Sequence, residues 1–87
     1  EKLMSNTLLP IGSVVKILNV RKTVMIYGRN QLQTSSQKKY DYVSVPYPEG
    51  NINENYNLFF NHDMIEEVLF EGYQTQEEKA FQETLKG

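Results

Sequence analysis

Residues 13–29 read SVVKILNVRKTVMIYGR, two runs of mostly β-branched and apolar residues on either side of Arg21-Lys22. β-Branched side chains favour extended backbone, and the short charged break between the runs suits a chain reversal. The pattern predicts a β-hairpin over residues 13–29. Because each run is apolar on both faces, both faces must be covered, as in a curled sheet, a small barrel or a sheet with a helix laid on it.

The segments on either side of this hairpin are less regular. The apolar lead-in over residues 8–12 contains Pro10 and Gly12, which exclude a helix there. We assign residues 1–9 to an N-terminal extension and residues 10–87 to a single α+β domain. Residues 30–39 are polar, so they form either a mobile loop or an irregular extension of the strands.

Residues 40–46, YDYVSVP, have the alternation of a third strand. Alternation places the two valines on one face and the two tyrosines with Ser44 on the other. Pro46 ends the strand, since proline has no N–H for the ladder. Residues 47–50 have proline second and glycine fourth, which predicts a type I turn.

The second half of the chain predicts two further strands joined by one helical turn. Residues 56–60 form a short aromatic strand, and residues 66–73 form the last strand. Residues 61–65 between them suit a single turn of helix, in which the Asn61 side chain accepts from the following backbone N–H groups.

A C-terminal helix completes the predicted fold. Thr75 and Glu78 have the spacing of a capping box, which starts a helix of about three turns at Thr75. Phe81 and Leu85 lie on its apolar side and would pack on an edge or open end of the sheet. The predicted fold class is α+β: a curled antiparallel sheet of four to five strands, an SH3-like partial barrel, with this helix.

Composition excludes several kinds of site. The 87 residues contain no cysteine, which removes disulfides, thiol catalysis and cysteine-bound metals, and they contain one histidine, His62. There is also no apolar run of about 18 residues, the length that a membrane helix requires. We therefore expect a cytoplasmic protein that binds neither a metal nor a membrane.

Charge is unevenly distributed along the chain. Residues 1–39 carry seven basic residues and one acidic residue, whereas residues 40–87 carry two basic and ten acidic residues. The two halves thus hold +6 and −8, which gives the overall charge of −2. Such a chain either neutralises itself on folding or offers oppositely charged faces to different partners.

The sequence shows no catalytic set. His62 stands beside Asp63 in a predicted turn, where adjacent side chains seldom face each other, and no nucleophile motif accompanies it. We expect a capping or surface histidine. Glu66, Glu67 and Glu71 resemble a paired-carboxylate site, but we expect Glu67 and Glu71 to point outward from a solvated strand face. The chain is predicted to be non-enzymatic and to use no cofactor.

Aromatic residues are the most informative class for function. Six tyrosines and four phenylalanines are more than so small a core can enclose, and tyrosines left outside a core are favoured in protein interfaces. They could also simply bridge the core and its rim. The predicted partner-binding residues are Tyr40, Tyr42, Tyr47, Pro48 and Tyr56.

Basic residues near tyrosines also fit a small nucleic-acid-binding barrel, which would combine base stacking with phosphate contacts. The isoelectric point of about 5.3 opposes this interpretation. The residues concerned are Arg21, Lys22, Arg29, Lys38 and Lys39.

Four blocks of the chain carry a resemblance to a known family: residues 8–15, 25–29, 40–50 and 59–73. The most specific part is DYVSVPYPEG, residues 41–50. The chain resembles small cytosolic proteins of unknown function that are encoded in Gram-positive type VII secretion loci beside LXG-type toxins. The resemblance implies a genomic neighbourhood and no catalytic residues.

This neighbourhood implies a non-enzymatic accessory or adaptor protein that binds a secreted toxin, or the toxin's helical targeting partner, before export. An immunity protein whose acidic half faces a basic toxin domain is the first alternative, and the nucleic-acid-binding barrel is the second. We expect a monomer or weak dimer with a protein partner from the same locus.

Overall fold

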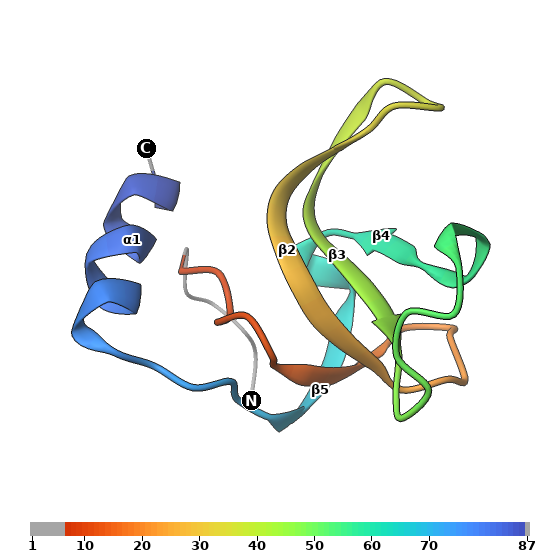
Figure 1. Cartoon of the computed structure of the whole chain (residues 1–87), viewed down its shortest axis with the longest axis horizontal. Coiled ribbons are helices and arrows are strands. Elements are labelled where there is room, and N and C mark those ends of the chain that lie inside the picture. Colours follow the sequence, from red (N-terminus) through yellow and green to blue (C-terminus); the bar gives the residue numbers. More distant parts are fainter. Residues whose placement is uncertain (1–6, 87) are drawn as a thin grey trace.

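The computed structural model describes residues 7–86, which form an antiparallel sheet and a C-terminal helix (Figure 1). This arrangement confirms the predicted α+β class. The strands are β1 (Val14–Ile17), β2 (Val24–Gln33), β3 (Lys38–Pro46), β4 (Leu58–Phe60) and β5 (Ile65–Phe70). The helical elements are the 3-10 turns η1 (Glu54–Tyr56) and η2 (His62–Met64) and the helix α1 (Gln76–Lys86).

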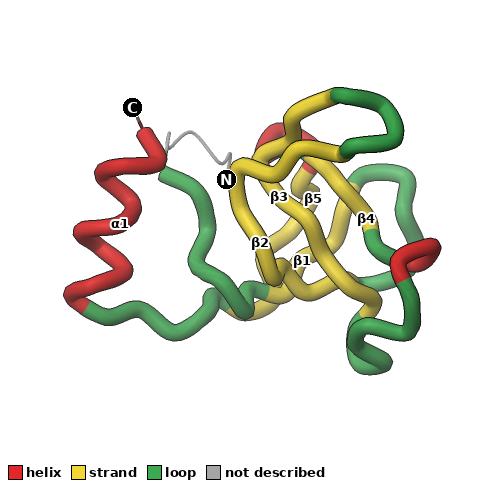
Figure 2. Tube along the Cα trace, turned by 45° about the horizontal axis from the view of Figure 1, so that its top comes forward, coloured by secondary structure: helices red, strands yellow, loops and turns green. Residues whose placement is uncertain are grey.

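The sheet is strongly curled, as predicted. Its strand order is β4-β3-β2-β1-β5, and each neighbouring pair is antiparallel. β4 and β5 therefore lie at opposite edges, yet residues 61–64 suffice to connect them. So short a link requires the sheet to bend until its two edges approach each other, as the turned view in Figure 2 shows. The sheet does not close into a barrel.

The polar segment at residues 30–39 is mostly strand. β2 continues to Gln33 and β3 begins at Lys38, so that only residues 34–37 form the turn. The Gln37 N–H donates to the Gln33 carbonyl at 2.8 Å. Of the two predicted alternatives, the strand extension is confirmed: a two-stranded ribbon forms its backbone ladder without an apolar face, and it projects from the sheet in Figure 1.

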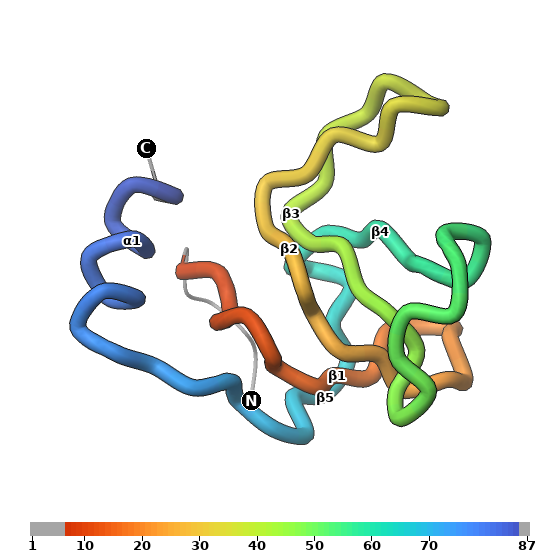
Figure 3. The backbone as a smooth tube through the Cα atoms, in the orientation of Figure 1, coloured from red at the N-terminus to blue at the C-terminus, as the bar shows by residue number. Residues whose placement is uncertain are grey.

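The core lies on the concave face of the sheet and includes two residues that precede the strands. Leu8 and Leu9, which the sequence analysis assigns to the extension, are buried in it, whereas residues 1–6 lie outside the described residues. Figure 3 shows residues 7–12 between α1 and the sheet. The other members of the cluster are Val15, Ile17, Val24, Ile26, Tyr42, Phe60 and Ile65.

Three local predictions are wrong. The turn after β3 is not type I, because the Gly50 N–H donates to the Pro46 carbonyl at 2.7 Å, one residue further back than that turn requires; the Tyr47–Pro48 peptide is cis. The predicted strand over residues 56–60 begins only at Leu58, because η1 includes Tyr56. The last strand ends at Phe70 rather than at residue 73.

Asn61 does not cap the turn that follows it. Its side-chain oxygen instead accepts from the Asp41 N–H at 3.0 Å, while an Asp41 carboxylate oxygen accepts from the His62 N–H at 2.8 Å. The side chain of Asp41, rather than that of Asn61, therefore accepts from a backbone N–H of the turn. These two hydrogen bonds hold η2 against β3.

Gly72 ties the end of β5 to the segment before β1. Its N–H donates to the Ser13 hydroxyl at 3.0 Å, and that hydroxyl donates to the Pro10 carbonyl at 2.8 Å. Ser13 is fully buried. A Cβ on Gly72 would overlap the backbone carbonyl of Ile11, so the two segments approach this closely only because the residue is glycine.

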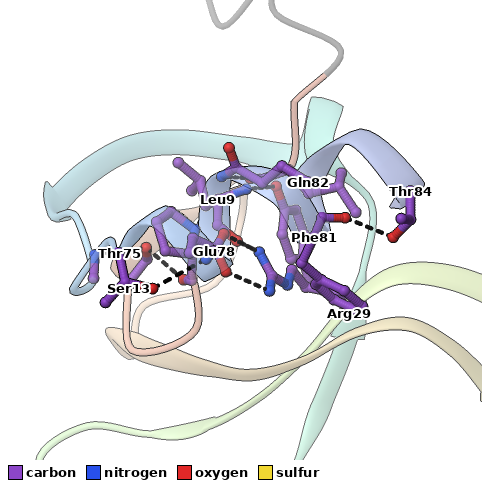
Figure 4. A network of polar contacts seen from close by, with 12 residues as sticks. Leu9, Ser13, Arg29, Thr75, Glu78, Phe81, Gln82 and Thr84 are labelled. Atoms are coloured by element: carbon purple, nitrogen blue, oxygen red, sulfur yellow. Dashed lines mark hydrogen bonds and ion pairs between the residues drawn. The ribbon is translucent and has the colours of Figure 1, made fainter. Parts of the chain in front are cut away.

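Only one of the two hydrogen bonds of the predicted capping box forms at the start of α1. The Thr75 hydroxyl accepts from the Glu78 N–H at 3.0 Å, but the Glu78 carboxylate turns to Arg29, with contacts of 2.6 and 2.9 Å to the guanidinium (Figure 4). Phe81 is half exposed and lies against the same guanidinium, 5.3 Å from ring centroid to Cζ. Leu85 packs against the core cluster, as predicted.

The Arg29–Glu78 pair predicts a pH dependence of stability. Hydrogen bonds from Arg29 hold the pKa of the Glu78 carboxyl below its ordinary value of 4.5. The stabilisation is therefore fully present above pH 4.5 and is lost as the pH falls through the lowered pKa. In urea titrations between pH 7 and pH 3, Glu78→Gln should flatten the loss of unfolding free energy more than Glu49→Gln, which removes an exposed carboxyl. Equal flattening in both variants would contradict this role for Glu78.

Candidate protein-binding face

An apolar row crosses the outer face of the sheet. The strand registers place Phe70 opposite Val14, Val14 opposite Met25 and Met25 opposite Val45. Val15 and Val24, next to two of these residues in sequence, point into the core. Phe70, at the sheet edge, is 61% exposed, so a large apolar ring stands in solvent at one end of the row.

A groove of about 390 Å³ lies along this row, and we call it the outer groove. Its lining consists of Gly12, Val14, Met25, Tyr47 and Phe70. Tyr47 is 48% exposed, so the groove offers an aromatic side chain at each end and aliphatic side chains between them. Exposed apolar surface of this kind gains free energy when a partner removes it from water, and it offers no reacting group.

Carboxylates stand beside the outer groove. Glu66, Glu67 and Glu71 are exposed in or directly after β5. On the other side of the turn that carries Tyr47, the exposed Lys22 and Glu49 form an ion pair at 2.8 Å. The groove is therefore apolar within, and its β5 side carries three glutamates, one of which, Glu67, lies opposite Lys16 of β1.

The predicted partner-binding residues do not form one surface. Tyr47 and Pro48 are exposed in the turn after β3, and Tyr47 lines the outer groove. Tyr56 is 60% exposed in η1. Tyr40 is half-buried, with its ring centroid 5.8 Å from that of Phe59. Tyr42 is fully buried and cannot contact a partner at the surface, because the curled sheet encloses its face of β3.

Tyr42 has a structural role instead. Its hydroxyl accepts from the Leu9 N–H at 2.8 Å and lies 2.6 Å from Nδ1 of His62. Burial raises the pKa of Tyr42, so the hydroxyl keeps its proton, and it shares with His62 Nδ1 one hydrogen bond whose direction is set by the tautomer of the ring. The expectation of a capping or surface histidine is wrong, since the His62 ring is a hydrogen-bond partner of the core.

Replacing Tyr42 with phenylalanine should destabilise the domain by about 1–3 kcal/mol, because the change leaves the Leu9 N–H and His62 Nδ1 buried without their partner. Urea denaturation would measure the loss. Tyr40→Phe is the matched control in the same strand, and we expect it to change stability by less than about 0.5 kcal/mol. Equal effects of the two changes would contradict the role of the Tyr42 hydroxyl.

A second, more polar groove of about 570 Å³ separates the β2–β3 hairpin from η1. Tyr27 and Phe59 line it together with polar side chains, and the Asn57 amide donates to the Tyr27 hydroxyl at 3.1 Å. Of the basic residues considered for nucleic acid, Lys22 and Arg29 are bound to carboxylates. These two ion pairs leave less free positive charge than the sequence suggests.

Two searches of the described chain gave no candidates. Within residues 7–86, no group of three or more histidine, cysteine, aspartate or glutamate side chains could hold a metal ion. Over the same residues, no helix has both the length and the apolar character needed to cross a membrane.

Comparison with known proteins places the chain in a family. A family model described as a domain of unknown function, DUF4176, matches residues 8–81. The chain belongs to the DUF4176 family. No curated protein and no solved structure matches it. The match confirms the resemblance to a small family of unknown function, and the DUF4176 range starts at Leu8, the first buried residue of the core.

Sequence reasoning missed most of the groove in this DUF4176 domain. Val14 and Met25 belong to runs that the sequence predicts to be buried on both faces, and the alternation of the last predicted strand places Phe70 on the face opposite Glu67 and Glu71. Phe70 could have been found from its place in the last strand, which lies at an edge of the sheet. Val14 and Met25 lie in the interior strands β1 and β2, where no local pattern marks an uncovered outer face. Tyr47 is the one groove residue that the sequence analysis did select.

Proposed function

We propose that this domain is a non-enzymatic protein-binding module, an accessory protein of a type VII secretion locus. The observation that carries the proposal is the outer groove, where Phe70 and Tyr47 stand exposed at the ends of an apolar row. A solvent-exposed phenylalanine beside further apolar side chains is typical of a surface that a partner covers.

The resemblance to proteins encoded beside LXG-type toxins supports a partner from the same locus. We propose the toxin's N-terminal helical region or its helical targeting protein, bound in the cytoplasm before export. Exposed aromatic side chains suit such a role, since Tyr47 buries a ring while its hydroxyl stays in water.

Mixing this protein with products of the neighbouring genes would test the proposal. Size-exclusion chromatography with light scattering should show a stable complex at micromolar concentration. Phe70→Ser combined with Met25→Ser should weaken the complex at least tenfold, because both changes remove apolar area from the groove.

Leu32→Ser is the matched control for this experiment. Leu32 is 48% exposed on the β2–β3 hairpin and lines the other groove, so its removal should leave the complex unchanged. Thermal melts of all variants would confirm that they fold. No complex with any neighbouring protein, or equal weakening by Leu32→Ser, would overturn the proposal.

An immunity protein is a second candidate, favoured by the exposed carboxylates Glu66, Glu67 and Glu71 beside the groove. A basic toxin domain would be attracted to this side of the molecule. Co-expression with the toxin domain distinguishes the two functions, because an immunity protein protects the cell from the toxin and an adaptor does not.

A further inference from the structure

β5 lies at the edge of the sheet, next to the outer groove. It pairs with β1 on one side, and within residues 7–86 no strand pairs with its other side. Such an edge presents backbone N–H and C=O groups that a further strand can bind. Phe70, the last residue of β5, is also part of the groove lining, so the open edge and the apolar row meet.

The open edge is acidic. Glu66 and Glu67 are exposed in β5, and Glu71 is exposed directly after it. Among residues 7–86, no side chain forms an ion pair with any of these three glutamates. Lys16 of β1 lies opposite Glu67 in the register, so the three glutamates and this lysine give the edge a net charge of −2. Such an edge attracts a positively charged segment and repels an acidic one.

Resting on the proposed protein-binding function, we infer that β5 binds a basic, extended segment of the partner protein as a sixth strand of the sheet. The backbone of that segment would pair with the free side of β5. One of its apolar side chains would lie beside Phe70 and continue the row formed by Met25, Val14 and Phe70. Its lysine or arginine side chains would face the glutamates.

A second copy of this chain does not fit the same edge. Antiparallel pairing of two β5 strands would bring Glu66 and Glu67 of both copies together, and like charges opposed across strands are destabilising. Glutamates on an edge strand also oppose aggregation through that edge. The charges that reject self-association favour a lysine- or arginine-rich strand.

Designed peptides provide the test. An acetylated eight-residue peptide of alternating lysine and valine would be titrated into ¹⁵N-labelled protein, alongside a peptide with glutamate in place of lysine. The basic peptide should bind with the largest amide shifts at residues 65–71, and the acidic peptide should not bind. In an extended peptide, the N–H groups of alternate residues point to opposite edges. N-methylation of the set that pairs with β5 should abolish binding of the basic peptide, whereas N-methylation of the other set should not.

Charge reversal separates specific pairing from general attraction. Glu66→Lys with Glu67→Lys should weaken binding of the basic peptide at least tenfold. Glu54→Lys with Glu77→Lys changes the net charge equally at exposed positions in η1 and α1 and should weaken binding less than threefold. The inference would be overturned if both double variants weakened binding equally, or if the basic peptide did not bind. It would also be overturned if N-methylation of neither set of alternate amides changed binding.

The same variants distinguish this inference from the proposed function. If Phe70→Ser with Met25→Ser abolishes the complex with the locus partner while Glu66→Lys with Glu67→Lys leaves it intact, strand addition is overturned and the protein-binding function stands. If both double variants leave the complex intact, the proposed groove is not the binding face and both are overturned.

Discussion

Gly72→Ala is expected to destabilise the domain by roughly 3 kcal/mol or more. A Cβ at Gly72 would lie 2.9 Å from the Ile11 carbonyl carbon and 3.0 Å from the Ser13 nitrogen. Both neighbours are backbone atoms, which cannot move aside as a flexible side chain can. Relief would require the end of β5 to separate from the segment before β1, breaking the Gly72–Ser13 hydrogen bond.

Urea denaturation and a ¹H–¹⁵N spectrum would measure this loss. Gly50→Ala is the matched control, because nothing lies within 4 Å of a Cβ there and only the positive φ of 80° opposes it. That backbone conformation costs about 1–2 kcal/mol with a side chain. If Gly72→Ala lowered the free energy of unfolding no more than Gly50→Ala, the two backbone segments would not approach each other as closely at Gly72 as described.

Arg29→Met is expected to cost about 2–3 kcal/mol, because it leaves the Glu78 carboxylate without its partner in a site with little access to water. The two side chains are 5% and 12% exposed and form two hydrogen bonds. Arg29 also donates to the Leu9 carbonyl at 3.2 Å. One guanidinium thus joins β2, α1 and the segment before β1.

A double-mutant cycle isolates the pair. Arg29→Met with Glu78→Met should recover part of the lost stability, since no charge is then left unpaired. Lys22→Met is the control: it removes an ion pair whose side chains are 48% and 46% exposed, and because water screens such a pair, this change should alter stability little. Equal effects of Arg29→Met and Lys22→Met would contradict the structural role of Arg29.

The elements that repeat a strong local pattern were predictable from the sequence. The hairpin at residues 13–29 and the helix after Thr75 follow from β-branched runs and from capping spacing, and both are present. The fold class follows from them, because an antiparallel sheet followed by a separate helix is an α+β arrangement. The turn after β3 and the start of β4 depend on tertiary hydrogen bonds, which no local pattern records.

The site was less predictable for a related reason. Tyr40 and Tyr42 have the same alternation in β3, yet one is half exposed and the other fully buried. Their difference depends on Leu9 and His62, which are distant in sequence and reach only Tyr42. In the sequence, Arg29 is one of several basic residues that suggest nucleic-acid binding. In the structure it forms an ion pair with Glu78.

The position of β5 also determines when the domain can fold. Val14 pairs with Phe70, and the Gln82 side chain donates to the Leu8 carbonyl at 3.2 Å, so the first part of the core is completed by the last part of the chain. During synthesis, β1, β2 and β3 leave the ribosome with their apolar faces uncovered. Folding to the native state therefore requires residues 65–85, and until these have been made the apolar faces of β1, β2 and β3 stay in contact with water.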